Sequence, residues 1–145
     1  MNPRERVYVA LGSNLGDREG YLARAREALG KLPLTTVLAV SSLEETEPVG
    51  GPPGQGPYLN QMVLVETALD PGRFLKQLHR IEDENGRERG ERWGPRTLDL
   101  DIVRFGTRRL RDADLRIPHL ELPNRDWWQR EIEEVDRLAP ARTDD

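Results

Sequence analysis

The first forty residues change from a strand pattern to a helix pattern and back. Residues 6–11 alternate between polar and apolar positions and predict a strand, which the turn-forming cluster 12–16 ends. Apolar side chains then recur at helical spacing, so we expect a helix that Asp17 caps and that Gly30 stops. The β-branched and apolar segment 35–42 predicts a second strand.

The middle of the chain combines a loop, a strand and a second helix. Residues 50–57 read GGPPGQGP, a composition that excludes a helix or a central strand and is typical of a functional loop. Residues 59–67 alternate and predict the third strand. Asp70 and Pro71 open a helix that ends near Asn85. Its inward positions are Phe74, Leu75, Leu78 and Ile81.

The last third of the chain begins with an arginine-rich loop at residues 87–96. Residues 97–105 predict a fourth strand, and residues 115–118 predict a short extended piece. We expect Asn124 to cap a final helix. Its apolar positions at helical spacing are Trp128, Ile132 and Val135.

The predicted order is β-α-β-β-α-β followed by a helical tail. This order indicates the α+β class, with a ferredoxin-like antiparallel sheet, helices on one face and a C-terminal helical tail. No repeat or linker divides the chain, so we expect one domain over residues 1–145, with an acidic tail from about residue 126. Because many unrelated functions use this architecture, the fold leaves the chemistry open.

Composition excludes several classes of protein and site. The chain has 145 residues, of which 36% are hydrophobic and 33% charged, and no apolar run approaches the ~20 residues of a membrane span. Its N-terminus carries no signal-peptide pattern, so we expect a cytoplasmic protein. With 0 cysteines and 2 histidines, thiol chemistry is excluded and a multi-histidine metal site is implausible.

The basic residues are unusual in kind and in position. Lys31 and Lys76 are the only lysines among 22 basic residues, a bias that habitat or phosphate binding could each produce. Residues 80–111 carry a net charge of +2, whereas the whole chain has −4. One locally basic stretch in an acidic chain favours a small anionic ligand over nucleic acid.

The fourth predicted strand carries two carboxylates on one face. Asp99 and Asp101 alternate with Leu98, Leu100 and Ile102, and side chains two positions apart in a strand share a face. Such a pair can be an ordinary polar edge. Because like charges side by side cost energy unless a cation lies between them, and hard oxygen ligands suit Mg²⁺, the pair also indicates a magnesium site.

Four arginines directly precede this strand: Arg87, Arg89, Arg92 and Arg96. Guanidinium groups on a glycine-bearing loop beside metal-binding carboxylates are typical of a polyphosphate site and of phosphoryl transfer. A solvated charge run that pairs with neighbouring glutamates is the alternative. No GxxxxGK[ST] motif occurs, so the chain is not a P-loop enzyme.

The segment ERWGPRTLDLDI, residues 91–102, resembles the signature of the 6-hydroxymethyl-7,8-dihydropterin pyrophosphokinase family. The motifs ALGSNLGD, YLN at residues 58–60, IPH at residues 117–119 and Asn124-Arg125 fit the same family in the same order. The resemblance therefore extends from about residue 7 to about residue 125.

The resemblance implies transfer of an intact diphosphoryl group from ATP to the hydroxymethyl group of the dihydropterin, with release of AMP. It implies two Mg²⁺ ions on Asp99 and Asp101, and it makes Arg87 and Arg96 catalytic together with these aspartates. The residues it assigns to ATP are Glu82, Arg87, Trp93, Arg96, Ile102, His119 and Arg125. Taken alone, His119 could equally be a buried, hydrogen-bonded imidazole.

The resemblance also implies a site for the flat pterin ring. Tyr58 and Trp127 would sandwich the ring, and Asn60 with the backbone near Thr46 and Val49 would contact its edge. Trp93 is a further pterin-binding residue by the same resemblance. By themselves, Tyr58 could be a packing aromatic and Asn60 a strand-edge amide.

The chain departs from the family pattern mainly after Arg125. The usual apolar continuation is replaced by DWWQREIEEVDRLAP, Leu120 stands where an aromatic often packs, and Asp114 and Arg116 change the charges of the adenine-side segment. We expect a monomer that binds neither nucleic acid nor membrane. The rival hypotheses are a ferredoxin-like module that binds nucleotides or RNA without chemistry, and a family member that has lost activity.

Overall fold

A computed structural model describes residues 3–48, 53–86 and 97–142 of the chain. It is a mixed α/β structure with an antiparallel sheet and three helices, as the α+β prediction required. The elements in chain order are β1 (Glu5–Ser13), α1 (Arg18–Gly30), β2 (Thr35–Val40), β3 (Glu44–Thr46), β4 (Tyr58–Thr67), α2 (Pro71–Glu84), β5 (Asp99–Phe105), β6 (Leu110–Arg111), β7 (Arg116–Ile117), a 3-10 helix (Leu122–Asn124) and α3 (Asp126–Leu138).

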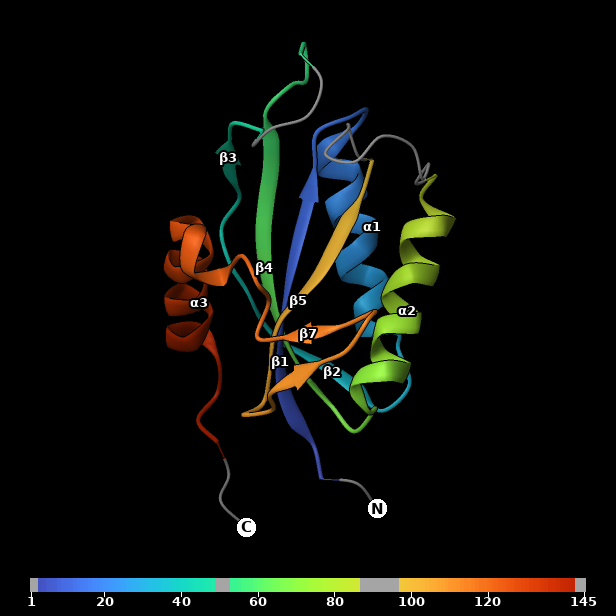
Figure 1. The fold of residues 1–145 in the computed structure, drawn as a ribbon, viewed down its shortest axis with the longest axis vertical. Coiled ribbons are helices and arrows are strands. Elements are labelled where there is room, and N and C mark those ends of the chain that lie inside the picture. The colour runs from blue at the N-terminus through green and yellow to red at the C-terminus, as the bar shows by residue number, and fades with distance from the viewer. Residues whose placement is uncertain (1–2, 49–52, 87–96, 143–145) are drawn as a thin grey trace.

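The central sheet has the strand order β2-β4-β1-β5, and β3 adds a second, shorter partner to β4. Every pairing in it is antiparallel. The two central strands, β1 and β4, are therefore hydrogen-bonded on both sides. Strands β6 and β7 form a separate two-stranded sheet that crosses in front of β5 (Figure 1).

Helices cover both faces of the sheet (Figure 1). Helices α1 and α2 pack on one face, where Leu22, Leu29, Phe74 and Leu78 are fully buried against β1, β4 and β5. Helix α3 packs on the opposite face, where it forms a second, smaller core. The residues of that second core are Ala10, Ala39, Met62, Leu64, Val103, Leu122, Trp128, Ile132 and Val135.

Local sequence signals begin the first two helices where they were expected. The Asp17 carboxylate accepts a hydrogen bond from the backbone N–H of Gly20 at 3.1 Å, and the Asp70 carboxylate accepts one from Arg73 at 2.9 Å. Pro71, whose φ is preset for a helix, occupies the first turn of α2. These caps satisfy backbone donors that have no partner inside the helix.

Three expectations about the elements need correction. Asn124 does not cap α3, because it ends a 3-10 helix and its amide donates to Glu121, while Arg125 occupies the cap position without a side-chain hydrogen bond. The second strand ends at Val40 rather than at residue 42. The short strand β3 was not expected, because its sequence Glu-Glu-Thr has no apolar alternation.

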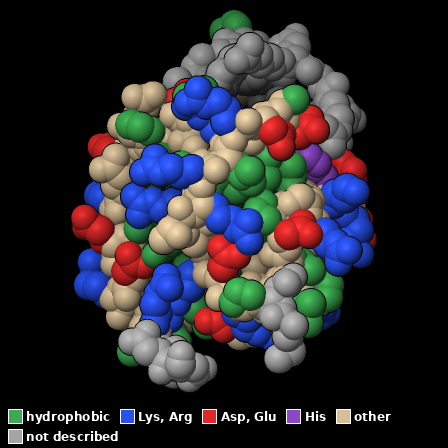
Figure 2. All heavy atoms as spheres, turned by 60° about the horizontal axis from the view of Figure 1, so that its bottom comes forward, with side chains coloured by type: hydrophobic (Ala, Val, Ile, Leu, Met, Phe, Trp, Pro, Cys, Tyr) green, Lys and Arg blue, Asp and Glu red, His purple; other side chains and the backbone are tan. Residues whose placement is uncertain are grey.

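The charged surface is mixed where Figure 2 shows it. In that view, Lys and Arg side chains are interspersed with Asp and Glu side chains. None of the described helices is both long and apolar enough to cross a membrane.

Candidate active site

Strand β5 carries the two carboxylates that the sequence analysis selected. Leu100 and Ile102 are 4% and 3% exposed and belong to the core beneath α2, whereas Asp99 and Asp101 are partly exposed on the other face. The register places Asp101 opposite Ala10 and Asp99 opposite Gly12 of β1. The predicted alternation is therefore confirmed, and it brings both carboxylates to one side of the sheet.

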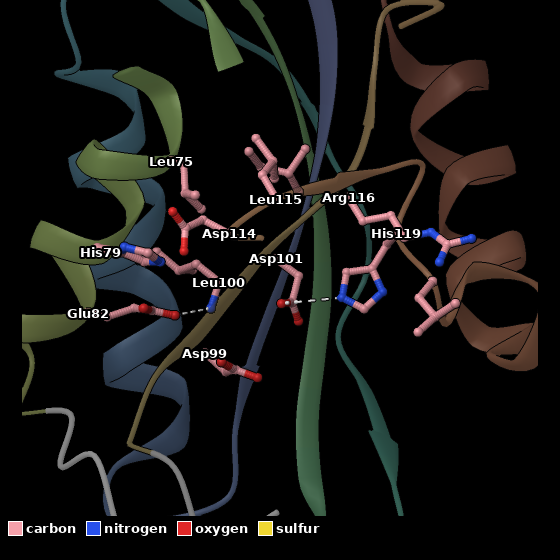
Figure 3. Close-up of a pocket in the computed structure, with 12 residues that line it drawn as sticks. Leu75, His79, Glu82, Asp99, Leu100, Asp101, Asp114, Leu115, Arg116 and His119 are labelled. Atoms are coloured by element: carbon pink, nitrogen blue, oxygen red, sulfur yellow. Dashed lines mark hydrogen bonds and ion pairs between the residues drawn. The ribbon is translucent and has the colours of Figure 1, made fainter. Parts of the chain in front are cut away.

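Both aspartates line a cavity of about 260 Å³ between α2, β5 and β7. Figure 3 shows His79 and Glu82 on one side of it, His119 on the other, and the aspartates between them. The full lining is Leu75, His79, Glu82, Asp99, Leu100, Asp101, Ile102, Asp114, Leu115, Arg116, His119 and Leu120. The cavity is thus lined by both apolar and charged side chains.

His119 is held by one hydrogen bond from its backbone and one to its ring. Its backbone N–H donates to the Val103 carbonyl at 2.9 Å, and its Nδ1 accepts a hydrogen bond from the Glu121 N–H at 3.0 Å. Because Nδ1 is an acceptor, Nε2 carries the proton in the neutral ring. Nε2 lies 3.6 Å from Oδ1 of Asp101, so this N–H is directed at the carboxylate side of the cavity (Figure 3).

Glu82 projects from α2 toward the start of β5. It is only 1% exposed, and its Oε2 accepts a hydrogen bond of 2.7 Å from the backbone N–H of Leu100, the residue between the two aspartates. This bond attaches α2 to the backbone that carries the carboxylates. The residue expected at the nucleotide therefore forms part of the cavity wall and also fixes the strand.

A second group of candidate residues lies where β3 meets β4. Thr46 is paired in register with Tyr58, and the Asn60 amide Nδ2 donates to Thr46 Oγ1 at 2.7 Å and to the Glu44 carbonyl at 3.1 Å. These bonds orient the Asn60 amide, so that its Oδ1 is the atom left to accept hydrogen bonds. Three of the expected pterin residues are therefore brought together.

The two groups are connected by a row of residues across the sheet. Gly12 of β1 lies opposite Asn60 on one side and opposite Asp99 on the other. Directly opposed residues of antiparallel strands share a face, and two steps between strands separate the outer Cα atoms by about 10 Å. A Cβ at Gly12 would lie 3.4 Å from the Tyr58 ring and 3.7 Å from Asn60 Oδ1, so both side chains pack directly against this buried glycine.

Arg125 and Trp127 stand at the start of α3. The Arg125 guanidinium lies 4.5 Å from the centre of the Trp128 ring and 5.9 Å from that of Trp127. Trp127 is partly buried against the core under α3, and its Nε1 has no hydrogen-bond partner among the residues that the structure describes. The altered sequence after Arg125 therefore still presents aromatic side chains beside this arginine.

Four of the expected site residues lie outside the described residues: Val49, Arg87, Trp93 and Arg96. The same holds for Arg89 and Arg92. In the described ranges, no group of three or more Asp, Glu or His side chains is placed to hold a metal ion. Because Mg²⁺ in proteins is often held by one or two carboxylates together with substrate phosphates and water, the aspartate pair fits such an ion.

The sequence analysis did not select Gly12 or Trp128 as site residues. The sequence assigns Gly12 to a turn. Its place between Asn60 and Asp99 becomes visible only in the strand register. Trp128 was expected in the core, where it is 2% exposed, but it also touches Arg125 and His119. The three-residue separation of Arg125 and Trp128, which brings side chains together at a helix start, was the one signal available.

One carboxyl group near the site has a strongly shifted pKa. Burial raises the pKa of Glu131 on α3 to about 8, and the negative charges of Glu44 and Glu134 add to the effect, whereas Arg130 opposes it. Glu131 therefore favours its protonated form at neutral pH. Glu44, whose carboxylate acts on Glu131, is also the residue of β3 whose backbone carbonyl accepts a hydrogen bond from Asn60.

Comparisons with known proteins show the family to which the chain is similar. Residues 8–137 match the family model described as 7,8-dihydro-6-hydroxymethylpterin-pyrophosphokinase (HPPK). Three curated relatives carry the name 2-amino-4-hydroxy-6-hydroxymethyldihydropteridine pyrophosphokinase. The Bacillus subtilis protein is 46% identical over 113 residues, which cover 78% of this chain and 67% of the relative. The Haemophilus influenzae and Pseudomonas aeruginosa proteins are 42% and 44% identical over 121 residues, which cover 83% of this chain and 75% and 74% of theirs.

Proposed function

The chain belongs to the 7,8-dihydro-6-hydroxymethylpterin-pyrophosphokinase family, and we propose that the face of the sheet around Asp99 and Asp101 is its active site. The activity is transfer of diphosphate from ATP to the hydroxymethyl group of 6-hydroxymethyl-7,8-dihydropterin in folate biosynthesis, with AMP as the other product. One observation carries the assignment of the site. The row Asn60, Gly12, Asp99 joins the pterin residues to the carboxylates on a single face.

The carboxylates supply the magnesium site of this proposal. Asp99 and Asp101 would hold two Mg²⁺ ions together with phosphate oxygens, since both carboxylates line the cavity and offer the hard oxygen donors that the ion prefers. Bound there, the ions neutralise phosphate charge and lower the pKa of the accepting hydroxyl group. No side chain among the described residues is then required as a dedicated base.

The nucleotide lies in the cavity between α2 and His119. The His119 Nε2–H, which faces Asp101 at 3.6 Å, donates to a phosphate oxygen. Arg125 approaches the same phosphates from the start of α3, and Arg87, Arg96 and Trp93 complete this side by family resemblance. Ile102 and the apolar part of the cavity receive the base, while Glu82 keeps the strand in place through Leu100. These residues bind and orient the nucleotide and stabilise the negative charge of its phosphates.

The pterin lies over the β3–β4 end of the row. Tyr58 and Trp127 offer ring faces, and Asn60 presents Oδ1 because its Nδ2 is occupied by Thr46 and Glu44. That oxygen accepts from an N–H group at the edge of the pterin, and Val49 lies beside it by family resemblance. With its ring there, the hydroxymethyl group points along the row toward Asp99, which places acceptor and phosphate for in-line transfer.

The finer features of the prediction belong to the same proposal. The strand order β2-β4-β1-β5, with β3 as an addition to β4, supports a ferredoxin-like arrangement of the four longer strands. We also propose one domain, a monomer and a cytoplasmic location.

The test is formation of AMP from ATP with and without the dihydropterin, in Mg²⁺ and in EDTA. Pterin-dependent AMP that disappears in EDTA is the expected result. Asp101→Asn removes a metal ligand without changing size, so we expect a loss of at least about a hundredfold in kcat. Glu133→Gln, on the exposed side of α3, is the matched control and retains full activity.

Two outcomes would overturn the proposal. AMP formed without the pterin indicates a nucleotide hydrolase, and no AMP from a folded protein indicates a family member without activity. Near-normal turnover in Asp101→Asn, with the control also normal, would reject the magnesium assignment and leave the family membership unaffected.

A further inference from the structure

Trp128 contacts both described residues that the family resemblance assigns to the phosphate chain of ATP. The guanidinium of Arg125 lies 4.5 Å from the centre of the indole, within the range of a cation–π interaction. The imidazole of His119 packs edge-on against the same indole, with centroids 4.9 Å apart and planes at 88°. A single buried side chain thus touches two polar groups that come from different segments.

The position of Trp128 is set by the core and by the helix start. Trp128 is 2% exposed and packs with Ile132 and Val135, which follow it along one face of α3. Its backbone N–H donates to the Arg125 carbonyl at 3.1 Å, so the two residues stand one turn apart. The indole is consequently held at fixed depth under α3, and Arg125 and His119 can use it as a rigid surface.

The contact with Trp128 restrains the His119 ring in the one respect that the hydrogen bonds of His119 do not, the orientation of the ring plane. The backbone bond to Val103 holds the main chain, and the Glu121 N–H holds Nδ1. Packing against the indole restrains the plane of the ring, and that plane determines where the Nε2–H points. Nε2 lies 3.6 Å from Asp101 Oδ1, so the orientation of the indole determines where the Nε2–H lies relative to the carboxylates of the cavity.

We propose that Trp128 is a positioning residue for ATP, which aligns His119 and Arg125 for the phosphate chain without touching the nucleotide. This inference rests on the proposed function, because it takes its two polar neighbours as phosphate ligands. A leucine would keep the core apolar, although it is smaller than the indole, but it offers no π face to a guanidinium and no flat surface to an imidazole. The indole therefore has a role beyond filling space.

The first experiment compares three variants in the AMP assay, with ATP varied at saturating pterin and pterin varied at saturating ATP. Trp128→Leu keeps an apolar core and removes both aromatic contacts. Trp128→Phe keeps an aromatic surface and serves as the conservative rescue. Ile132→Ala, one turn farther along α3 and 6% exposed, damages the same core without altering a residue of the site.

We expect Trp128→Leu to raise the KM for ATP about tenfold and to leave the KM for the pterin within about twofold. The reason is that displacing His119 and Arg125 weakens the binding of ATP and not that of the pterin. Trp128→Phe should have a KM for ATP much closer to that of the wild type than to that of Trp128→Leu. Ile132→Ala should lower the unfolding midpoint and leave both KM values near those of the wild type. An ATP KM in Trp128→Leu that stays within about twofold of wild type, or an equal rise in Ile132→Ala, overturns the inference.

A second experiment uses the unmodified protein and needs neither catalysis nor a folded variant. A non-hydrolysable ATP analogue with Mg²⁺ is titrated while the ring protons of the 2 histidines and the indole signals are followed by NMR. The Trp128 and His119 signals should show a mutual nuclear Overhauser effect and shift together on binding. Binding that shifts His119 and leaves Trp128 unchanged rejects the inference. A wild type that binds the analogue but forms no pterin-dependent AMP rejects only the proposed activity.

Discussion

The buried carboxyl group of Glu131 makes the stability of the protein depend on pH. Glu131 is 3% exposed under α3, where burial and the charges of Glu44 and Glu134 raise its pKa from 4.5 to about 8, against the opposing charge of Arg130. Replacing it by glutamine keeps the size of the side chain and removes the titration. The variant therefore isolates the free energy that ionisation of this group costs the folded state.

The sign and size of the effect follow from the two pKa values. The folded state binds this proton more tightly than the unfolded state, so the contribution to stability is complete below about pH 4.5 and is lost as the pH rises through about 8. The total loss has an upper limit of about 5 kcal/mol, at ~1.4 kcal/mol per pKa unit. Between about pH 6 and about pH 9 the loss is about 3 kcal/mol.

Urea unfolding of wild type and Glu131→Gln, followed by far-ultraviolet circular dichroism, measures this difference. Groups other than Glu131 titrate in both proteins, so their effects cancel when the two free energies of unfolding are subtracted. We expect the free energy of unfolding of the variant, relative to that of the wild type, to rise by about 3 kcal/mol between about pH 6 and about pH 9. Glu133→Gln, at an exposed position of α3, should show no such gain. If the difference for Glu131→Gln changes by less than about 0.5 kcal/mol, the argument is wrong.

Three further substitutions test the site. Arg96→Ala should lower kcat/KM at least about tenfold; a smaller effect, under ~1.4 kcal/mol, would show that this arginine does not clamp phosphate. Tyr58→Ala should raise the KM for the pterin and spare that for ATP, and the opposite pattern would move Tyr58 to the nucleotide site. Gly12→Val adds methyl groups beyond a Cβ position that already lies 3.4 Å from the Tyr58 ring, so the new side chain displaces Tyr58 and Asn60. It should raise the pterin KM at least about tenfold, while isothermal titration shows unchanged binding of the non-hydrolysable ATP analogue. Unchanged KM values in Gly12→Val would place the pterin elsewhere.

The parts of the fold that follow from local periodicity could be predicted from the sequence. The alternation of Asp99 and Asp101 with buried leucine and isoleucine needs only the two-residue repeat of a strand, and it is confirmed. Asp17 and Asp70 cap helices through bonds to residues three positions away, which sequence spacing also determines. Strand β3 could not be predicted, because its three polar residues form a strand only by pairing with β4.

The site contacts that were missed depend on packing between distant segments. Glu82 was expected at the nucleotide, and nothing in its sequence neighbourhood shows that it accepts a hydrogen bond from Leu100, eighteen positions later. Likewise, the apolar spacing in the tail predicted a buried Trp128 but not the face of the sheet it would meet. Trp128 contacts His119 because α3 packs on the face of the sheet opposite α1 and α2. Helical periodicity does not determine on which face a helix packs.

The location of the site follows from how far α3 extends along its face of the sheet. Under the helix, this face is apolar, with Met62, Leu64 and Val103 in the second core. On the same face, Asp101 stands in the row of Met62 and Ala10, and the next row holds Asn60, Gly12 and Asp99. Burying these polar groups under a longer helix would cost free energy unless each found a partner. Arg125, Trp127 and Trp128 lie where the helix begins, so the aromatic and cationic side chains of the proposed site stand at the boundary between the apolar and the polar part of this face.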